Sequence, residues 1–262
     1  MTEIPTLPDW LTPRVETTRE LFCGDTFEVM SQLPDRSFDL ILADLPYGTT
    51  RNKWDVVLPF DLLWEHYSRL IKPTGVIVLF GAGLFAARLQ LSSPTYKYKW
   101  IWEKNVATNF LNSKKQPLRS FEEICVFYDG SPTYDPQFWE GNPYKGDPYV
   151  RTRKSFPSKN YNHFENTVST SGDDKRYPRD IIKFNTCFNE GRVWHSTQKP
   201  VALGEYLIKT YTNEGDSILD NTMGVGSFGV AARNLNRGFV GIDDKPDFVQ
   251  IAFERIFLGR VK

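Results

Sequence analysis

Short apolar runs alternate with amphipathic segments along most of the chain. Continuous apolar residues predict buried strands at residues 21–23, 38–43, 75–80, 98–102, 123–127, 217–220 and 238–243. Apolar residues at helical spacing predict helices at residues 59–71, 82–91, 200–211, 227–236 and 246–257. Because strands that are apolar on both faces are typical of parallel sheets covered by helices, the pattern predicts an α/β fold with a Rossmann-like, mostly parallel twisted sheet and helices on both faces.

The pattern breaks between residues 129 and 192, where prolines and charged residues dominate. Neither the alternation of a strand nor the period of a helix holds there, and aromatic residues are scattered among polar ones. Between Lys145 and Lys183, nine Lys and Arg side chains stand against five Asp and Glu, a local excess of four positive charges. This composition is typical of loops next to a nucleic acid, and equally of a solvated insertion that packs on the main domain.

Charge and composition narrow the class of protein. The whole chain has 32 basic and 32 acidic residues and no net charge, so a basic footprint for nucleic acid exists only locally. No apolar run approaches the ~20 residues that span a bilayer, and no secretory segment is present near the start, so we expect a cytoplasmic protein. Cys23, Cys125 and Cys187 are far apart and are expected to be reduced, mostly buried thiols, and no metal site is predicted.

The segment Asp44-Leu45-Pro46-Tyr47 follows the apolar run at residues 38–43. Enzymes with α/β folds place their chemistry at such strand ends. A carboxylate, a carbonyl fixed by the following proline and an aromatic ring can hold a planar group with an exocyclic NH2, which describes a nucleobase. Taken alone, the segment is also an ordinary turn, in which Pro46 sets φ and Gly48 takes a positive φ.

A second element lies near the other end of the chain, where residues 217–243 predict a strand, a glycine-rich turn, a helix and a strand. Gly224 and Gly226 let the backbone approach a ligand closely. Asp220 can hold a cationic amine, and Asp243 can accept both hydrogen bonds of a ribose diol. Because the turn lacks the three-glycine spacing of the dinucleotide fingerprint, a ligand with a ribose and an amine but no phosphate fits better.

Together, the two elements resemble the family of amino-methyltransferases that use S-adenosylmethionine to methylate exocyclic nitrogens of DNA bases. Asp44-Leu45-Pro46-Tyr47 is similar to the family's catalytic motif, Asp-Pro-Pro-Tyr. Residues 220–226 are similar to its cofactor loop, Asp-Pro-Phe-x-Gly-x-Gly, with Asn221 and Thr222 at the positions of the proline and the phenylalanine. The catalytic motif precedes the cofactor loop, as in the family's permuted β group.

Two shorter segments carry the same resemblance. Residues 195–200, His-Ser-Thr-Gln-Lys-Pro, are similar to a His-Pro-Thr-Gln-Lys-Pro segment beside the methionine end of the cofactor, and Gly24-Asp25 is similar to an acidic position near its adenine. The resemblance implies a structural role for His195 rather than that of a general base. It implies S-adenosylmethionine as the cofactor, held by Asp25, His195, Thr197, Lys199, Asp220, Thr222, Met223, Gly224, Gly226 and Asp243.

The resemblance also implies an organisation like that of bacterial or phage DNA adenine methyltransferases. An N-terminal tail at 1–18 would precede a permuted class I methyltransferase domain at 19–130 and 193–262, with an inserted target-recognition region at 131–192. The target base must be flipped out of double-stranded DNA to be reached. The expected catalytic residues are Asp44, Leu45, Pro46 and Tyr47. The expected DNA-binding residues are Arg51, Lys53, Arg151, Arg153, Lys154, Arg176 and Arg179.

Adenine N6 is the expected methyl acceptor, because the family's cytosine members commonly carry serine where this chain has Asp44. Cytosine N4, an RNA adenine, and an inactive DNA-binding protein of the same fold stay open as alternatives. The loop at residues 49–54 either folds over the flipped base or anchors Trp54 in the core. Members of the family often pair, so a homodimer is among the expectations, in the cytoplasm of a bacterial or phage-infected cell. Restriction-modification, self-protection and regulation all fit such an activity.

Overall fold

The computed structural model describes residues 17–50, 52, 55–141, 149–151, 167–169, 174–189, 193–195 and 197–259. It divides into two compact units, one formed by Met1–Asp135 with Asp180–Lys262 and the other by Pro136–Arg179. No helix in the described part of the chain is long and apolar enough to cross a membrane.

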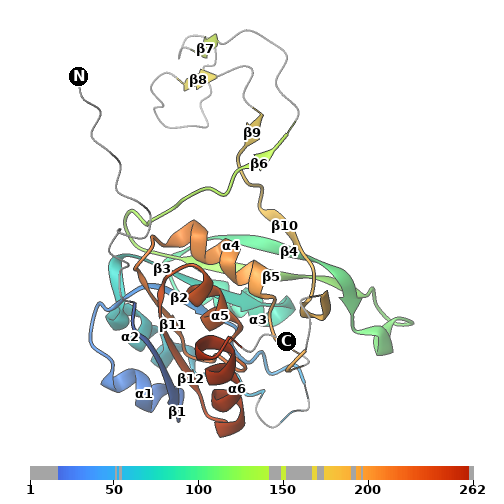
Figure 1. Ribbon diagram of the computed structural model, residues 1–262. Helices are drawn as coiled ribbons and strands as arrows, with labels where there is room; N and C mark the ends of the chain where they lie inside the picture. The colour runs from blue at the N-terminus through green and yellow to red at the C-terminus, as the bar shows by residue number, and fades with distance from the viewer. Residues whose placement is uncertain are drawn as a thin grey trace, which may run out of the picture. The chain divides into compact units, whose positions relative to one another are not determined.

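The first unit is built on an eight-stranded sheet in the order β1-β12-β11-β2-β3-β5-β4-β10 (Figure 1). Five of the seven neighbouring pairs are parallel, and β5 runs antiparallel to both β3 and β4. The strands are β1 (Arg19–Cys23), β2 (Phe38–Ala43), β3 (Ile71–Gly81), β4 (Tyr96–Thr108), β5 (Arg119–Phe127), β10 (Ile181–Phe184), β11 (Ser217–Asp220) and β12 (Gly238–Asp243). The predicted mostly parallel α/β sheet is therefore confirmed.

Helices cover both faces of this sheet, as predicted. They are α1 (Thr26–Gln32), α2 (Phe60–Leu70), α3 (Gly83–Leu91), α4 (Val201–Tyr211), α5 (Ser227–Asn234) and α6 (Pro246–Phe257). Leu40 and Leu42 of β2 pack in one core cluster with residues of α4, α5 and α6, whereas Ile41 and Ala43 pack with residues of α1, α2 and α3. Each fully buried Leu or Ile contributes roughly 1.5–3 kcal/mol relative to an exposed one. The continuous apolar run of β2 thus reflects burial on both faces.

Two elements of the first unit were not predicted from the sequence. Helix α1 has only one fully buried side chain, Met30, so it lacks an apolar stripe, and it begins because Asp25 Oδ1 accepts hydrogen bonds from the backbone N–H groups of Phe27 and Glu28. Strand β10 is four residues long, and only Ile182 in it is buried. It forms because it pairs in parallel with β4, Ile182 lying opposite Trp102. Such a short edge strand leaves no clear pattern in the sequence.

Strand β10 lies within residues 131–192, the range expected for the insertion. It belongs to the main sheet, whereas Pro136–Arg179 form the second compact unit. In that unit, β6 (Trp139–Glu140) pairs with β9 (Lys175–Arg176) and β7 (Tyr149–Arg151) pairs with β8 (Thr167–Ser169), both antiparallel. These two- and three-residue strands are too short to be recognised from alternation of apolar residues.

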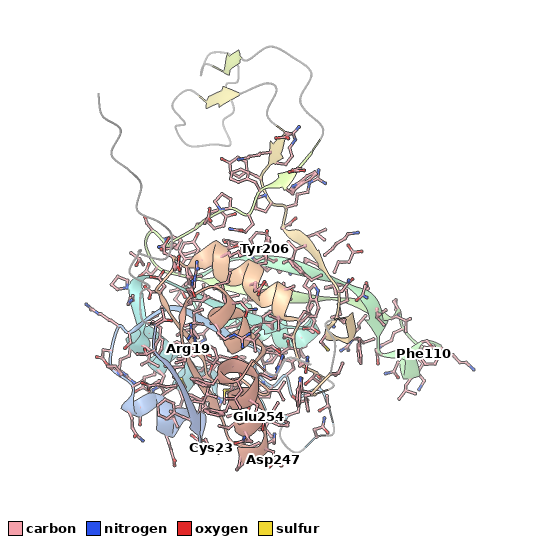
Figure 2. All side chains as sticks on the ribbon, viewed as in Figure 1. Arg19, Cys23, Phe110, Tyr206, Asp247 and Glu254 are labelled. Carbon is pink, nitrogen blue, oxygen red and sulfur yellow. The ribbon has the colours of Figure 1, made fainter. Side chains whose placement is uncertain are left out.

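Strands β4 and β5 extend well beyond the predicted ranges 98–102 and 123–127, as an antiparallel hairpin that leaves the body of the first unit (Figure 1). A short 3-10 helix, η2 (Phe110–Asn112), lies in its connection, and Figure 2 shows Phe110 near the far end. Phe110 and Leu111 are 75% and 98% exposed. Exposure of both faces explains why the extension carries no apolar pattern. We call residues 105–121 the β4–β5 hairpin tip.

Candidate active site

Three carboxylates lie at the ends of neighbouring parallel strands. Asp44 directly follows β2, Asp220 ends β11 and Asp243 ends β12, and β11 lies between the other two strands. Parallel strands bring their carboxyl ends to one edge of the sheet, so residues 199 positions apart in sequence meet there. The carboxylates of Asp44 and Asp243 both raise the pKa of Asp220, after burial as the larger cause.

The glycine-rich loop between β11 and α5 is held by bonds to these strand ends. The backbone N–H of Gly224 donates to Asp243 Oδ2 at 2.9 Å, and Lys245 N–H donates to Asp243 Oδ1 at 3.0 Å. Gly224 has a φ of 52°, and a Cβ added there would meet nothing within 4 Å. Gly226 has a φ of 77°, and a Cβ there would lie 2.8 Å from Cβ of Ala252 in α6. Gly224 therefore faces open space, whereas Gly226 allows α5 and α6 to pack closely.

The side chains in this loop point in different directions. Met223 is 5% exposed and packs against β12, since a Cβ on Gly241 would lie 2.4 Å from its Sδ atom. Thr222 donates its backbone N–H to Asp220 and its hydroxyl to the backbone carbonyl of Asp44 at 3.2 Å. The Thr222 hydroxyl thus joins the two sequence motifs directly.

Asp220 is 2% exposed, and none of the described residues forms an ion pair with it. Its carboxylate accepts one backbone hydrogen bond, from Thr222 at 3.2 Å. Burial therefore raises the pKa of Asp220 well above its usual value. Burial also raises the pKa of Asp243, against the two backbone N–H groups of Lys245 and Gly224. A cation bound at Asp220 would offset an electrostatic cost that the protein alone leaves in place.

The Asp44 carboxylate lies between Tyr47 and Lys199. Tyr47 donates its hydroxyl to Asp44 Oδ1 at 2.8 Å, and Lys199 Nζ lies 2.5 Å from Asp44 Oδ2. The Tyr47 ring stacks on Phe85 of α3, with ring centroids 4.9 Å apart. Leu45 is 2% exposed and its side chain lies in the core. Burial raises the pKa of Asp44, which Lys199 opposes and a further carboxylate, Glu122, reinforces.

Glu122 and Lys104 were not among the residues predicted from the sequence. Glu122 of β5 lies 3.2 Å from Lys199 Nζ and forms an ion pair with Lys104 of β4. The Tyr47 hydroxyl also lies 3.4 Å from Glu122 Oε2. The side chains of Lys199, Glu122 and Lys104 are 8%, 14% and 8% exposed. The sequence signal for these residues was a charged residue beside each of two apolar runs. It predicts an ion pair only when the two strands are known to be neighbours.

Burial and ion pairing act in opposite directions on this cluster. Burial disfavours the charged forms, but Asp44 and Glu122 outweigh it and raise the pKa of Lys199. In the same way, burial is outweighed by Lys199 and Lys104, which lower the pKa of Glu122. Lys199 and Glu122 are therefore both ionised at neutral pH.

The segment at residues 193–200 connects the two halves of the site. The His195 ring lies edge-on to Phe248 of α6 at 5.0 Å, and Asp243 and Lys245 both influence its pKa, which burial lowers. Thr197 Oγ1 lies 2.9 Å from His195 Nδ1. Lys199, by contrast, reaches Asp44 at the other half of the site. One short segment therefore spans from the loop at Asp243 to the segment at residues 44–47.

Asp25 lies next to the Asp243 strand end, because Gly24 N–H donates to the Asp243 carbonyl at 3.0 Å. Its Oδ1 atom caps α1, a structural role that the resemblance did not include. Asp55 is a further residue that the sequence did not single out. Its carboxylate accepts three backbone N–H groups, from Gly48, Thr49 and Thr50, and so holds the loop that follows Tyr47.

The predicted DNA-binding residues are only partly described. Arg51, Lys53, Arg153 and Lys154 lie outside the described residues, as does Trp54. Arg151 ends β7, and Arg176 ends β9. The Arg179 guanidinium lies over the Trp139 ring at 5.6 Å, so part of its charge is committed to a contact within the second unit.

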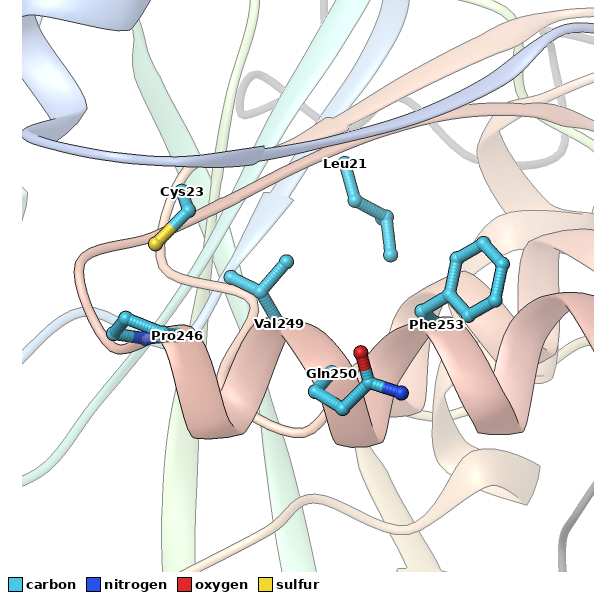
Figure 3. A pocket seen from close by; sticks show the side chains of 6 residues that line it. All are labelled: Leu21, Cys23, Pro246, Val249, Gln250 and Phe253. Atoms are coloured by element: carbon cyan, nitrogen blue, oxygen red, sulfur yellow. The ribbon is translucent and has the colours of Figure 1, made fainter.

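An open pocket of about 320 Å³ lies between β1 and α6 (Figure 3). It is lined by Leu21, Cys23, Pro246, Val249, Gln250 and Phe253, and it contains none of the predicted site residues. Cys23 is exposed here because β1 is an edge strand, whereas Cys125 and Cys187 are buried.

The fold and the strand-end carboxylates define a Rossmann-like α/β protein with a ligand loop joined to a second polar centre. Residues 38–254 match the family model of the DNA methylases designated N6_N4_Mtase, which is most of the chain. The protein therefore belongs to this family of DNA methylases, and the resemblance seen in its sequence is confirmed at that level.

Individual relatives are more distant. The type II methyltransferase M.HpaI of Haemophilus parainfluenzae is 28% identical over 251 residues, which cover 91% of this chain and 74% of that protein. The crystal structure of the M1.HpyAVI–SAM complex has a TM-score of 0.61 at 23% identity and covers 92% of this chain and 100% of that one. PvuII DNA methyltransferase, which is cytosine-N4-specific, has a TM-score of 0.63 at 15% identity, covering 92% and 88%. At these identities the two structures establish the shared fold.

Proposed function

We propose that this protein transfers the methyl group of S-adenosylmethionine to the exocyclic N6 of an adenine that is flipped out of double-stranded DNA. The observation that carries the proposal is the link between the two motifs. The Thr222 hydroxyl of the glycine-rich loop bonds the backbone of Asp44, whose carboxylate accepts the Tyr47 hydroxyl. A loop suited to a methyl donor and a motif suited to an exocyclic amine therefore share one edge of the sheet.

The residues present fit S-adenosylmethionine. Asp220 is a buried carboxylate without a cation among the described residues, and the ligand's amine supplies one. Each Asp243 oxygen accepts one backbone N–H and keeps acceptor capacity for a ribose hydroxyl. Gly224 borders open space. When bound, S-adenosylmethionine supplies an electrophilic methyl group on its sulfonium.

Asp25, His195, Thr197, Thr222, Met223 and Gly226 complete the proposed cofactor site. The short contacts of His195 with Phe248 and Thr197 support a positioning role near Asp243. Because Met223 is buried against β12, its contribution comes through the backbone. Lys199 acts at Asp44 instead of at the cofactor, since its ammonium lies 2.5 Å from that carboxylate.

The exocyclic NH2 of a base is a poor nucleophile, because its lone pair is delocalised into the ring. Asp44 accepts one N–H and the Leu45 carbonyl, fixed by Pro46, accepts the other, which localises the lone pair on nitrogen. Orienting two bound reactants in this way supplies ~7–11 kcal/mol. Tyr47 stacks on the base, a contact worth ~1–3 kcal/mol, and offsets part of the few kcal/mol that base flipping costs. Phe85 holds the Tyr47 ring in place for this contact.

Two basic regions are proposed to hold the duplex. The first is the inserted region, where Arg151, Arg153, Lys154, Arg176 and Arg179 are the candidates, together with Arg51 and Lys53 in the loop after the catalytic motif. The second is the β4–β5 hairpin tip, which contains Lys114, Lys115 and Arg119 and no acidic residue. It follows Lys104 on β4 and precedes Glu122 on β5, both of which belong to the cluster around Lys199. The tip therefore begins beside the catalytic centre, and its cations suit phosphates there.

Adenine is favoured over cytosine because Asp44 stands where cytosine members of the family commonly carry serine. Cytosine N4 is the second candidate, since the same fold serves a cytosine-N4-specific enzyme in PvuII DNA methyltransferase. The inactive alternative is disfavoured, because Asp44, Tyr47, Asp220 and Asp243 are all present at one edge of the sheet. A DNA substrate fits a location in the cytoplasm of a bacterial or phage-infected cell.

Labelled S-adenosylmethionine and unmethylated duplex DNA test the proposal, followed by digestion to nucleosides and identification of the labelled base. We expect label in N6-methyldeoxyadenosine, and none with Asp44→Ala, which should still bind the cofactor. Label in cytosine would establish the second candidate. Transfer to RNA alone, or no transfer, would overturn the proposed function.

A further inference from the structure

A chain of alternating charges extends from the catalytic motif into the sheet. Lys104 of β4 pairs with Glu122 of β5, Glu122 with Lys199, and Lys199 with Asp44 Oδ2. At the other end, Asp44 Oδ1 accepts the Tyr47 hydroxyl. Two cations and two anions therefore alternate over four separate segments of the chain. We call Lys104, Glu122, Lys199 and Asp44 the charge chain.

We propose that Glu122 is a positioning residue for methyl transfer: it holds the Lys199 ammonium so that Lys199 binds Asp44 Oδ2. Oδ1, which accepts the Tyr47 hydroxyl, then keeps a second acceptor position for the incoming amine. This rests on the proposed transfer at Asp44, but not on whether the base is adenine or cytosine. Glu122 contacts Lys199 and Tyr47 at 3.2 and 3.4 Å, and it acts on Asp44 through these contacts and through its charge.

The geometry explains why Lys199 needs a second anion. An ammonium has three N–H donors, and a carboxylate that alone neutralised a buried ammonium would be a weak acceptor for anything else. Glu122 takes part of the interaction, and the Phe80 and Tyr47 rings lie 5.1 and 5.7 Å from Lys199 Nζ. Lys199 is thus fixed from three sides, and Asp44 keeps acceptor strength on Oδ1.

Lys104 completes the arrangement by keeping Glu122 ionised. Without it, two buried carboxylates would compete for one ammonium. The charged and titratable groups around Asp44 are Tyr47 in its own loop, Lys199 before α4, Glu122 on β5 and Asp220 at the end of β11. Asp44 and Asp220 interact, because the Asp44 charge raises the pKa of Asp220. Lys104 reaches Asp44 only through Glu122. Removing the negative charge of Glu122 should therefore lower the pKa of Asp44, whereas removing the positive charge of Lys104 should raise it.

Glu122→Gln is the first test, and Glu123→Gln is its matched control. Glu123 is the next residue on β5, has a side chain of similar exposure, 12% against 14%, and pairs with Lys99 at 2.5 Å, away from Asp44. The readout is the single-turnover transfer rate against pH at saturating cofactor and DNA, which reports the chemical step rather than product release. For Glu122→Gln we expect the rate to fall about tenfold or more, since a small misplacement of a reacting group can cost ~10²-fold.

The direction of the pH profile separates positioning from damage to the fold. Glu122 raises the pKa of Asp44, so its loss should move the acid limb of the profile to lower pH. Lys104→Met, which leaves Glu122 free to draw Lys199 away, should move the acid limb to higher pH. Dissociation constants for the cofactor should change less than twofold in both variants.

Each outcome is decisive. Opposite shifts of the acid limb, with Glu123→Gln like the wild type, support the inference. Equal rates and profiles for Glu122→Gln and Glu123→Gln would overturn it, as would parallel losses of rate without opposite shifts. If Glu122→Gln does not fold, Glu122→Asp keeps the charge and shortens the reach, and an unchanged rate there would also count against positioning. A wild type without transfer would instead overturn the proposed function, before any variant is compared.

Discussion

Replacing Asp220 by asparagine should stabilise the ligand-free protein while destroying its cofactor site. Asp220 is 2% exposed and shares its sheet edge with Asp44 and Asp243. Burial, then the charges of Asp44 and Asp243, raise its pKa well above the value of an exposed carboxyl, against one hydrogen bond from Thr222. Asparagine has the same shape, keeps an oxygen for the Thr222 N–H and carries no charge.

The sign of the effect follows from the raised pKa. In the unfolded chain Asp220 ionises near pH ~3.9. Because its pKa in the folded protein is higher, its full contribution to stability is present below the unfolded pKa and is lost as the pH rises through the folded pKa. At neutral or higher pH the wild type therefore pays a desolvation penalty that Asp220→Asn lacks.

A buried, unpaired polar or ionisable group costs about 1–3 kcal/mol in proteins, because protonation limits the penalty. A change of 1 kcal/mol shifts Tm by ~2–4 °C in a domain of this size. We therefore expect the Tm of ligand-free Asp220→Asn to exceed that of the wild type by about 2–12 °C at pH 8. The difference should shrink as the pH is lowered and Asp220 takes up a proton.

Thermal unfolding with and without S-adenosylmethionine checks both halves of this prediction. Loss of a charge-assisted hydrogen bond costs ~1.5–3 kcal/mol, so the cofactor dissociation constant should rise about 10–100-fold and the stabilisation by the cofactor should disappear. Asp216→Asn, at a half-buried loop position before β11, is the control and should change neither quantity strongly. A ligand-free Tm that is unchanged or lower in Asp220→Asn would refute the electrostatic reasoning, and an unchanged dissociation constant would remove Asp220 from the cofactor site.

Three further predictions follow from the same structure. Asp55→Asn should loosen the loop after Tyr47. Burial raises the pKa of Asp55, but hydrogen bonds from the Thr50 side chain and from three backbone N–H groups outweigh it and lower the pKa. Wild-type protection of this loop against proteolysis should therefore persist above pH ~4 and fail as the pH falls further. Gly241→Ala should lower the free energy of unfolding by about 1–3 kcal/mol in chemical denaturation, because its Cβ would lie 2.4 Å from Met223 Sδ. Reversing two hairpin charges, Lys114→Glu with Lys115→Glu, should weaken duplex binding at least tenfold in a titration and reduce its salt dependence, with cofactor binding unchanged; equal affinities would exclude the hairpin tip from the DNA interface.

Local patterning was enough to predict most of the sheet and its helices. The run at residues 38–43 is β2 without adjustment, because Leu40 to Ala43 are buried on both faces of the sheet and are all apolar. Helix α1 and strand β10 were missed for the opposite reason, since each has one fully buried residue. One begins at a side-chain cap and the other at an edge pairing, and neither needs a periodic apolar pattern.

The candidate site also contains residues that the sequence revealed and residues that it did not. Asp44, Tyr47, Asp220 and Asp243 were recognisable in the sequence, because strand ends and glycine turns have local signatures, and the parallel topology then brought them to one edge. Glu122 and Lys104 have no such signature. Their meeting with Lys199 depends on which strands are neighbours and on the direction in which β5 runs.

By itself, the sequence determined the fold class, the family and the residue types at the ends of the strands. Only the tertiary structure decided that Lys199 turns to Asp44, that Glu122 and Lys104 stand behind it, and that Asp220 is left without a cation among the described residues. The physical reason is that burying a helix or a strand requires apolar residues at regular spacing within one short stretch of sequence. Ion pairs between buried side chains form across strands that are distant in sequence, so they cannot be recognised until the pairing of the strands is known.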